Sequence, residues 1–234
     1  MNWRKALARL TPASLKIDAV RGGIPEFTPQ EIAGALGFVK NKFGRELICH
    51  IYWPDGAALT EKDLQEMLAS RMRDEMNRLS REAVIAKLDL HIAEENWAAK
   101  INHYECERRE IAQLRHRAHA TKHAVWPWNA EMHVKIRDAV FSEIRYPNHC
   151  DKCQGKGDIE NAEGLVLTCT RCEGYGVVAI SDRQRADRIG RDESSYRENW
   201  KSVYEFAISQ VRDAEIEAGR EFGFALSDRE QKAA

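Results

Sequence analysis

The sequence has no long apolar run and no excess of one charge. Its 234 residues include 36 Lys and Arg against 37 Asp and Glu, so the formal net charge is −1. This balance excludes a protein whose whole surface is a basic nucleic-acid cradle, although it allows a local basic patch. No run approaches the roughly 18 apolar residues of a membrane-spanning helix, so we expect no membrane partner.

A secretory signal is also lacking. The opening stretch, residues 1–20, is basic and amphipathic, and it has no apolar core followed by a small-residue cleavage site. We therefore expect a cytoplasmic protein. In that reducing compartment its six cysteines are expected to be thiols or metal ligands rather than disulfides.

Glycine and proline are absent from residues 57–126, which predicts helix throughout this segment. Thr60 is the predicted N-cap, with Asp63 at the capping-box position. Apolar residues then recur at three- and four-residue steps, which predicts one buried face: Leu64, Met67, Leu68, Met72, Met76 and Leu79. We expect the periodicity to continue through Val84, Leu88 and Ile92. We predict two or three helices packed as hairpins, with one long coiled coil as the alternative.

The first 56 residues are richer in turn signals. Thr28, Pro29 and Glu31 predict an N-cap, a first helical residue and a capping box for a short helix. Residues 46–53 form an apolar run with β-branched and aromatic members, and we predict a strand there.

The segment 100–123 carries six Lys and Arg against three Glu, with four interleaved histidines. Such a face could contact phosphates, but a charge run is more often a solvated side of a helix, and we favour that interpretation. The histidines have helical spacing but no acidic or cysteine partner nearby in the sequence, so we predict no metal site among them.

The most specific motif is an internal repeat of the pattern CxxCxGxG. It occurs at residues 150–157 and again at residues 169–176, with 15 residues between the inner cysteines. Each CxxC turn brings two thiolates within reach of one ion, and the second pair completes a tetrahedron. The glycines permit positive φ, which lets backbone N–H groups point at the sulfurs.

We therefore predict one structural Zn²⁺ bound by Cys150, Cys153, Cys169 and Cys172. Four protein ligands leave no open position for water or substrate. Free thiols or two disulfides are the alternative. Cys49 and Cys106 stand alone and are predicted to be small buried residues.

The segment after the second CxxCxGxG repeat has the layout of a helix-turn-helix. Residues 181–190 predict a short helix with Ser181 as N-cap and Gly190 at its end, and an apolar stripe from Tyr196 to Val211 predicts a second, Ser-capped helix. A helical hairpin that merely packs is the alternative. The predicted contacts with DNA bases and phosphates are Arg183, Arg185, Arg188, Arg191, Ser194, Ser195, Arg197 and Lys201.

Together these patterns predict a mainly α protein with a small four-cysteine zinc insertion and a helix-turn-helix-like C-terminal segment. The expected regions are residues 1–56, with a short helix and a strand; 57–145, with long helices; 146–180, with the zinc knuckles; and 181–234, the C-terminal segment.

The order of these features resembles the late-gene antitermination proteins of lambdoid phages, the Q proteins of the lambda type. The resemblance covers residues 146–218 and rests on the two CxxCxGxG knuckles followed by Tyr196, Trp200, Val203 and Tyr204. It implies a protein of the bacterial host cytoplasm that binds DNA at a phage late promoter and carries RNA polymerase through terminators. The implied partners are the β flap of a sigma-containing paused polymerase and the host factor NusA.

Two other functional classes, cochaperone-like interaction modules and enzymes, fit the sequence less well. DnaJ-type cochaperones carry four CxxCxGxG copies, whereas this chain has two and lacks a His-Pro-Asp tripeptide. A zinc-stapled protein-interaction or cochaperone-like module without DNA reading is therefore the second hypothesis. No P-loop, GxSxG motif or open metal site occurs, so we expect no enzyme.

Overall fold

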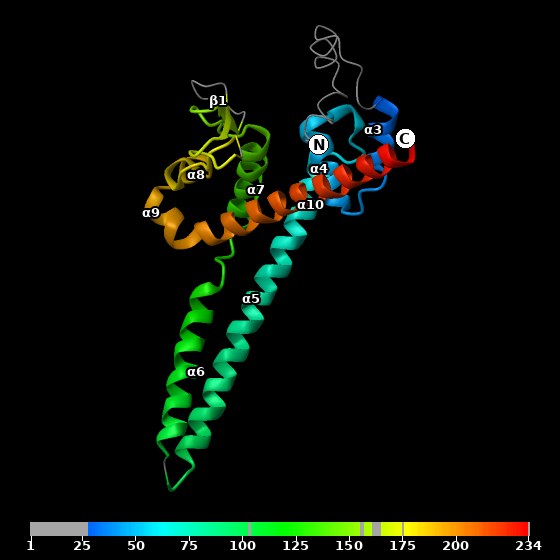
Figure 1. Cartoon of the computed structure of the whole chain (residues 1–234). Helices are drawn as coiled ribbons and strands as arrows, with labels where there is room; N and C mark the ends of the chain where they lie inside the picture. The colour runs from blue at the N-terminus through cyan, green and yellow to red at the C-terminus, as the bar shows by residue number, and fades with distance from the viewer. Residues whose placement is uncertain (1–27, 103, 155–156, 161–164, 175, 234) are drawn as a thin grey trace.

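The computed structural model describes residues 28–233, apart from residues 103, 155–156, 161–164 and 175. The amphipathic stretch 1–20 therefore lies outside the described residues. The described chain is mainly helical, as predicted, with one two-stranded sheet. Two lobes are joined by the long helix α10, and a helical arm projects from near their junction (Figure 1).

The first lobe in the chain begins with α3 (Pro29–Leu36) and α4 (Lys42–Tyr52), followed by the single turn η1 (Pro54–Gly56). Thr28 and Glu31 form the predicted capping box at the start of α3. The predicted strand at residues 46–53 is wrong, because most of this run lies inside α4. One side of α4 packs Leu47 into one core and another side packs Ile48 into a second core. The helical period of α4 is carried by polar residues, Lys42, Arg45, Glu46 and His50, most of which precede or begin the apolar run, so the run taken by itself resembles a strand.

The arm is a hairpin of α5 (Glu61–Ala98) and α6 (Glu105–Ala124). The predicted capping box of Thr60 and Asp63 is confirmed, as is the packing of residues 57–126 as a helical hairpin. The predicted single apolar face is correct only in its first half. Val84, Leu88 and Ile92 are about half to two-thirds exposed, because Val84 follows Leu79 by five residues, a step that turns the stripe by about 140° from the side that α5 buries at its start.

The second lobe contains α7 (Ala130–Arg145), the antiparallel strands β1 (Asp158–Glu160) and β2 (Val166–Thr168), and α8 (Asp182–Arg188). The short helix α9 (Glu193–Ser195) runs without interruption into the π-helical turn η2 (Tyr196–Trp200) and α10 (Lys201–Ala233).

The continuous helix of α9, η2 and α10 passes through both cores. Tyr196, Val203 and Tyr204 belong to the core of the second lobe, together with residues of α5 and α7. Farther along, Phe222 and Leu226 complete the core of the first lobe with α3 and α4. Helix α10 is therefore the element that joins the two lobes (Figure 1).

Helices α4 and α10 cross at very short distance. A Cβ on Gly44 would overlap the carbonyl oxygen of Ala214, so glycine permits this approach. At the start of α4 the Glu221 carboxylate of α10 accepts hydrogen bonds from the backbone N–H groups of Lys40 and Asn41, at 2.7 and 3.3 Å. These contacts fix the first lobe on the C-terminal part of α10.

None of the described helices combines the length and the apolar composition that are needed to cross a membrane.

Candidate metal centre and the adjoining helices

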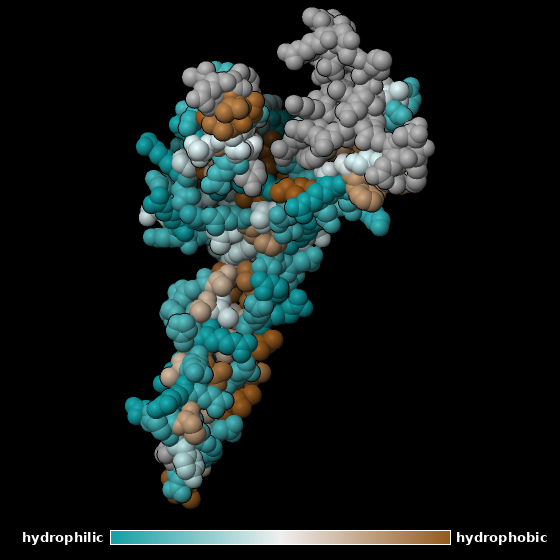
Figure 2. Space-filling model, viewed as in Figure 1, coloured by the Kyte–Doolittle hydropathy of each residue, from teal (hydrophilic) through white to brown (hydrophobic). Residues whose placement is uncertain are grey.

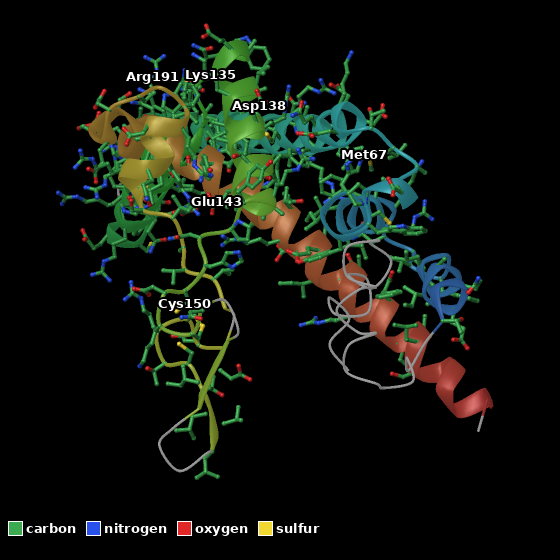
Figure 3. All side chains as sticks on the ribbon, turned by 90° about the horizontal axis from the view of Figure 1, so that it is seen from above. Met67, Lys135, Asp138, Glu143, Cys150 and Arg191 are labelled. Carbon is green, nitrogen blue, oxygen red and sulfur yellow. The ribbon has the colours of Figure 1, made fainter. Side chains whose placement is uncertain are left out.

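The four predicted cysteine ligands lie together. The sulfur atoms of Cys150, Cys153, Cys169 and Cys172 all lie within 4.8 Å of one another, and all four side chains are buried. Cys150 Sγ lies 3.8 Å from Cys169 Sγ, and Cys153 Sγ lies 3.6 Å from Cys172 Sγ. Figure 3 shows this cluster at the base of the β1–β2 ribbon, near the label of Cys150.

These distances fit a metal tetrahedron and do not fit disulfides. Four thiolates at about 2.3 Å from one ion would be about 3.8 Å apart, whereas bonded sulfurs lie about 2.05 Å apart. The cluster can therefore hold a metal ion, and tetrahedral sulfur coordination is typical of zinc and of iron.

The two knuckles are related by an internal repeat of hydrogen bonds. Cys150 N–H donates to the carbonyl of Gly176 at 2.8 Å, and Cys169 N–H donates to the carbonyl of Gly157 at 2.9 Å. Each knuckle therefore closes against the last glycine of the other. The sequence repeat thus becomes two mutually supporting turns around one centre.

Backbone donors also surround the sulfurs, as predicted. Gly157 N–H points at Cys153 Sγ at 3.3 Å, and Gly176 N–H points at Cys172 Sγ at 3.2 Å. Burial raises the pKa of the Cys169 thiol, but the backbone N–H groups of Cys172 and Arg171, together with the neighbouring thiols of Cys172 and Cys150, outweigh this and lower its pKa to about 7. Burial raises the pKa of the Cys172 thiol to about 11, despite its own backbone donors. Such donors stabilise thiolates, which is the form that binds a metal ion.

The glycines of the motif are required by their backbone geometry. Gly157 has φ +84°, and a Cβ there would overlap the carbonyl oxygen of Gly174. Gln154 and Glu173, which follow the second cysteine of each pair, also have positive φ, at 52°. Sequence reasoning assigned positive φ to the glycines and missed these two residues. Gly155 and the turn at residues 161–164 lie outside the described part of the chain.

The segment after the second knuckle has the predicted order of helix, turn and helix. Ser181 and Gln184 form a capping box at the start of α8, and Gly190 follows α8 with φ +68°. The predicted Ser cap of the second helix is wrong. Asp192 is the N-cap, because its carboxylate accepts a hydrogen bond from Ser195 N–H at 2.9 Å. That this unit reads DNA stays a prediction.

Apart from Ser195, the predicted DNA-contacting residues fall into three groups. Arg183, Arg188, Arg191 and Ser194 are exposed, and the three arginines form no ion pair with any other described residue. Arg197 and Lys201 are tied to the start of α8 instead, since both donate to Asp182, at 3.2 and 2.9 Å. Ser195 is half-buried in the first turn of the second helix.

Arg185 forms the third group, and here the structure corrects the prediction. Its side chain is only 9% exposed and donates twice to Glu143 of α7, at 2.8 and 3.1 Å. Arg185 therefore joins α8 to α7 and does not face a DNA partner. Its guanidinium also lies over the Tyr204 ring, at 4.9 Å.

Glu143 is the central residue that sequence reasoning missed. Besides Arg185, it accepts hydrogen bonds from the Tyr204 hydroxyl at 2.9 Å and from Arg212 at 3.0 Å. The available signal was its position. Glu143 follows Ile136 and Val140 at helical steps, so a carboxylate stands on the apolar face of α7, where an unpaired charge would be strongly unfavourable.

Comparisons with known protein families, curated proteins and solved structures find no match to this chain.

Proposed function

We propose that this protein is a zinc-stabilised DNA-binding protein and, more specifically, a phage-type transcription antiterminator. The observation that carries the proposal is the placement of the exposed arginines of α8 and its following turn directly after a closed four-cysteine centre. Arg183, Arg188 and Arg191 are exposed and form no ion pair with another described residue, so their charges are available to phosphates. Arg191 nevertheless lies near enough to Glu131 to add to the effect of Lys135, which lowers the pKa of that carboxyl.

The ion in this proposal is structural zinc. The cysteine donor set is complete and buried, and zinc so bound stabilises the fold without exposing a coordination position. Zinc would hold the two knuckles together in a segment with few other apolar contacts. The residues that flank the two knuckles are also joined shortly before α8 begins, because Val178 N–H donates to the Asn148 carbonyl at 2.8 Å.

The antitermination part of the proposal rests on the resemblance of residues 146–218 to the lambda-type Q proteins. It assigns the protein a late-promoter DNA element, the β flap of a sigma-containing paused RNA polymerase, and NusA as partners. The net charge of −1 supports weak non-specific DNA binding, so that loading would depend on the paused polymerase.

A gel-shift measurement on a late-promoter fragment tests DNA binding. We expect Arg188→Ala and Arg191→Ala each to weaken DNA binding. Each should also make the slope of log K against the logarithm of salt concentration shallower by about one, the value for one lost phosphate contact. Arg73→Ala is the matched control, because Arg73 is an exposed arginine of α5, distant in sequence from α8. Equal losses for all three variants, or no retardation by zinc-loaded protein, would refute the DNA-binding surface.

Transcription in vitro across a terminator tests antitermination separately. We expect readthrough to rise when the protein is present from initiation and to disappear after zinc is chelated. DNA retardation without readthrough would retain the DNA-binding half and remove the antitermination half. Partner binding without either activity would favour the protein-interaction module.

A further inference from the structure

Helix α5 has two apolar seams on opposite sides. The seam toward α6 follows steps of four and three residues and contains half-buried or buried residues: Leu79, Ala83, Ala86, Leu90, Ala93 and Trp97. The second seam contains the residues that lie two positions after the first five residues of the seam toward α6: Arg81, Ile85, Leu88, Ile92 and Glu95. Two positions correspond to about 200° of helical rotation, so most of the second seam points away from α6, although Ile92 also borders the cavity that α5 forms with Ile111 and Leu114 of α6.

Within the part of the chain that the structure describes, the apolar residues of the second seam are about half exposed. Ile85 is 51% exposed, Leu88 53% and Ile92 48%, and the neighbouring Val84 is 67% exposed. Figure 2 shows these apolar residues along the edge of the arm that α5 forms. Exposed apolar residues are common singly, but Ile85, Leu88 and Ile92 follow the four–three spacing of a heptad over about two turns of α5, and a stripe with this spacing is suited to pairing with another helix.

Helix α6 provides an internal comparison. Its own seam toward α5 has the same four–three spacing and contains Glu107, Ile111, Leu114, Ala118 and Thr121. All other positions of α6 are polar, alanine or cysteine. The arm therefore needs one seam on each helix for its own stability, and the second seam of α5 is additional.

The charges at the two ends of the second seam indicate what covers it. Arg81 and Glu95 lie seven residues before and seven residues after Leu88. If two copies of α5 pair in antiparallel orientation, each arginine meets the glutamate of the other copy. In parallel orientation, arginine would meet arginine and glutamate would meet glutamate, which is unfavourable.

We propose that the second seam of α5 binds the same seam of a second copy of this chain, in antiparallel orientation. The arm projects away from both lobes (Figure 1), so antiparallel arms place the lobes of the two copies at opposite ends. The apolar stripe is short compared with the interfaces of about 1,600 Å² that are typical of specific complexes. The dimer is therefore weak and depends on protein concentration, with a dissociation constant in the micromolar range or above.

Sedimentation equilibrium of the full, zinc-loaded chain over a range of concentrations tests the proposal. We expect reversible dimerisation of the wild type and at least a tenfold higher dissociation constant for Leu88→Ser. Ile101→Ser is the matched control, because Ile101 is 97% exposed on the same arm but lies outside the seam. Circular dichroism checks that each variant keeps its helix content. A wild type that stays monomeric at several hundred micromolar, or Leu88→Ser that dimerises as strongly as the wild type, overturns the proposal.

Charge exchange tests the orientation. Arg81→Glu and Glu95→Arg should each weaken the dimer, because each creates two like-charge contacts in the antiparallel pair. The double variant Arg81→Glu/Glu95→Arg should restore the wild-type dissociation constant. Single variants without effect, or a double variant as weak as the single ones, would overturn the antiparallel arrangement. None of these measurements depends on DNA or polymerase, so their outcome is separate from that of the proposed function.

Discussion

Replacing Glu143 by glutamine tests whether a buried carboxylate holds the second lobe together. Glu143 is 3% exposed at its side chain and pairs with Arg185, which is 9% exposed. Burial alone would lower the pKa of Arg185, but Glu143 raises this pKa above its ordinary value, so the guanidinium stays charged. Glutamine keeps the shape of the side chain and removes the charge, which leaves the Arg185 guanidinium buried without a counter-ion.

The expected loss follows from the three partners of Glu143. Breaking a buried ion pair by removing one member destabilises a protein by about 3–5 kcal/mol. Arg212 adds at most about 1 kcal/mol, because its side chain is 44% exposed and solvent screens its charge. The Tyr204 hydroxyl keeps an acceptor in the glutamine oxygen. We therefore expect Glu143→Gln to lower the free energy of unfolding by about 3–5 kcal/mol, a large part of the 5–15 kcal/mol typical of a domain.

Urea unfolding followed by far-UV circular dichroism measures this loss. The control Arg212→Gln removes the exposed partner and should change the free energy by less than about 1 kcal/mol. The pair Glu143→Leu/Arg185→Leu should be more stable than Glu143→Leu alone, because no buried charge is left unpaired. If Glu143→Gln stays within about 1 kcal/mol of the wild type, then Arg185 is solvated and the reasoning from burial is refuted.

Three further predictions concern the metal centre, the helix crossing and the response to pH. Cys150→Ser should lose most of the bound metal in native mass spectrometry, whereas Cys106→Ser should keep it; equal metal content would contradict the four-cysteine centre. Cys106 is outside the cluster and exposed, so its predicted burial is wrong, whereas that of Cys49 is confirmed. Gly44→Ala should lower the free energy of unfolding by about 1–3 kcal/mol through overlap with α10, whereas Gly223→Ala, where a Cβ meets no atom within 4 Å, should be neutral or slightly stabilising. Burial lowers the pKa of His133 below its usual 6.5, so the unfolded chain binds more protons below that pH and stability should fall as pH falls from 6.5 toward the folded-state pKa. Urea midpoints at pH 7.5 and 5.5 should show a smaller decrease for His133→Gln than for the wild type.

Local signals predicted the helix starts and the cysteine cluster. Thr28, Thr60 and Ser181 cap their helices because a capping box depends on residues within one turn. The CxxCxGxG repeat predicted the cluster because the four cysteines and the glycines that shape their turns all lie within two eight-residue motifs. These features need no knowledge of distant contacts.

Features that depend on distant contacts were not predictable from one sequence. The run at residues 46–53 resembles a strand because it is short and largely apolar, and the polar residues that show the helical period of α4 mostly precede it. One of its apolar sides is covered by residues of α10, a contact that the run itself does not reveal. Arg185 looks like any other arginine of α8 until Glu143, 42 positions earlier, is placed beside it. The two seams of α5 could be read from their spacing, but only the position of α6 shows which seam is uncovered.

The passage of α10 through both cores has a consequence for synthesis on the ribosome. Helices α3 and α4 are made before α10, and Phe222 and Leu226, which complete their core, follow about 170–190 residues later. At a synthesis rate of about 5–20 residues per second, the apolar faces of α3 and α4 stay without the covering residues of α10 for on the order of 10–40 s. We expect the nascent chain to need chaperone protection during this interval, and the first lobe to form only after nearly the whole chain has emerged.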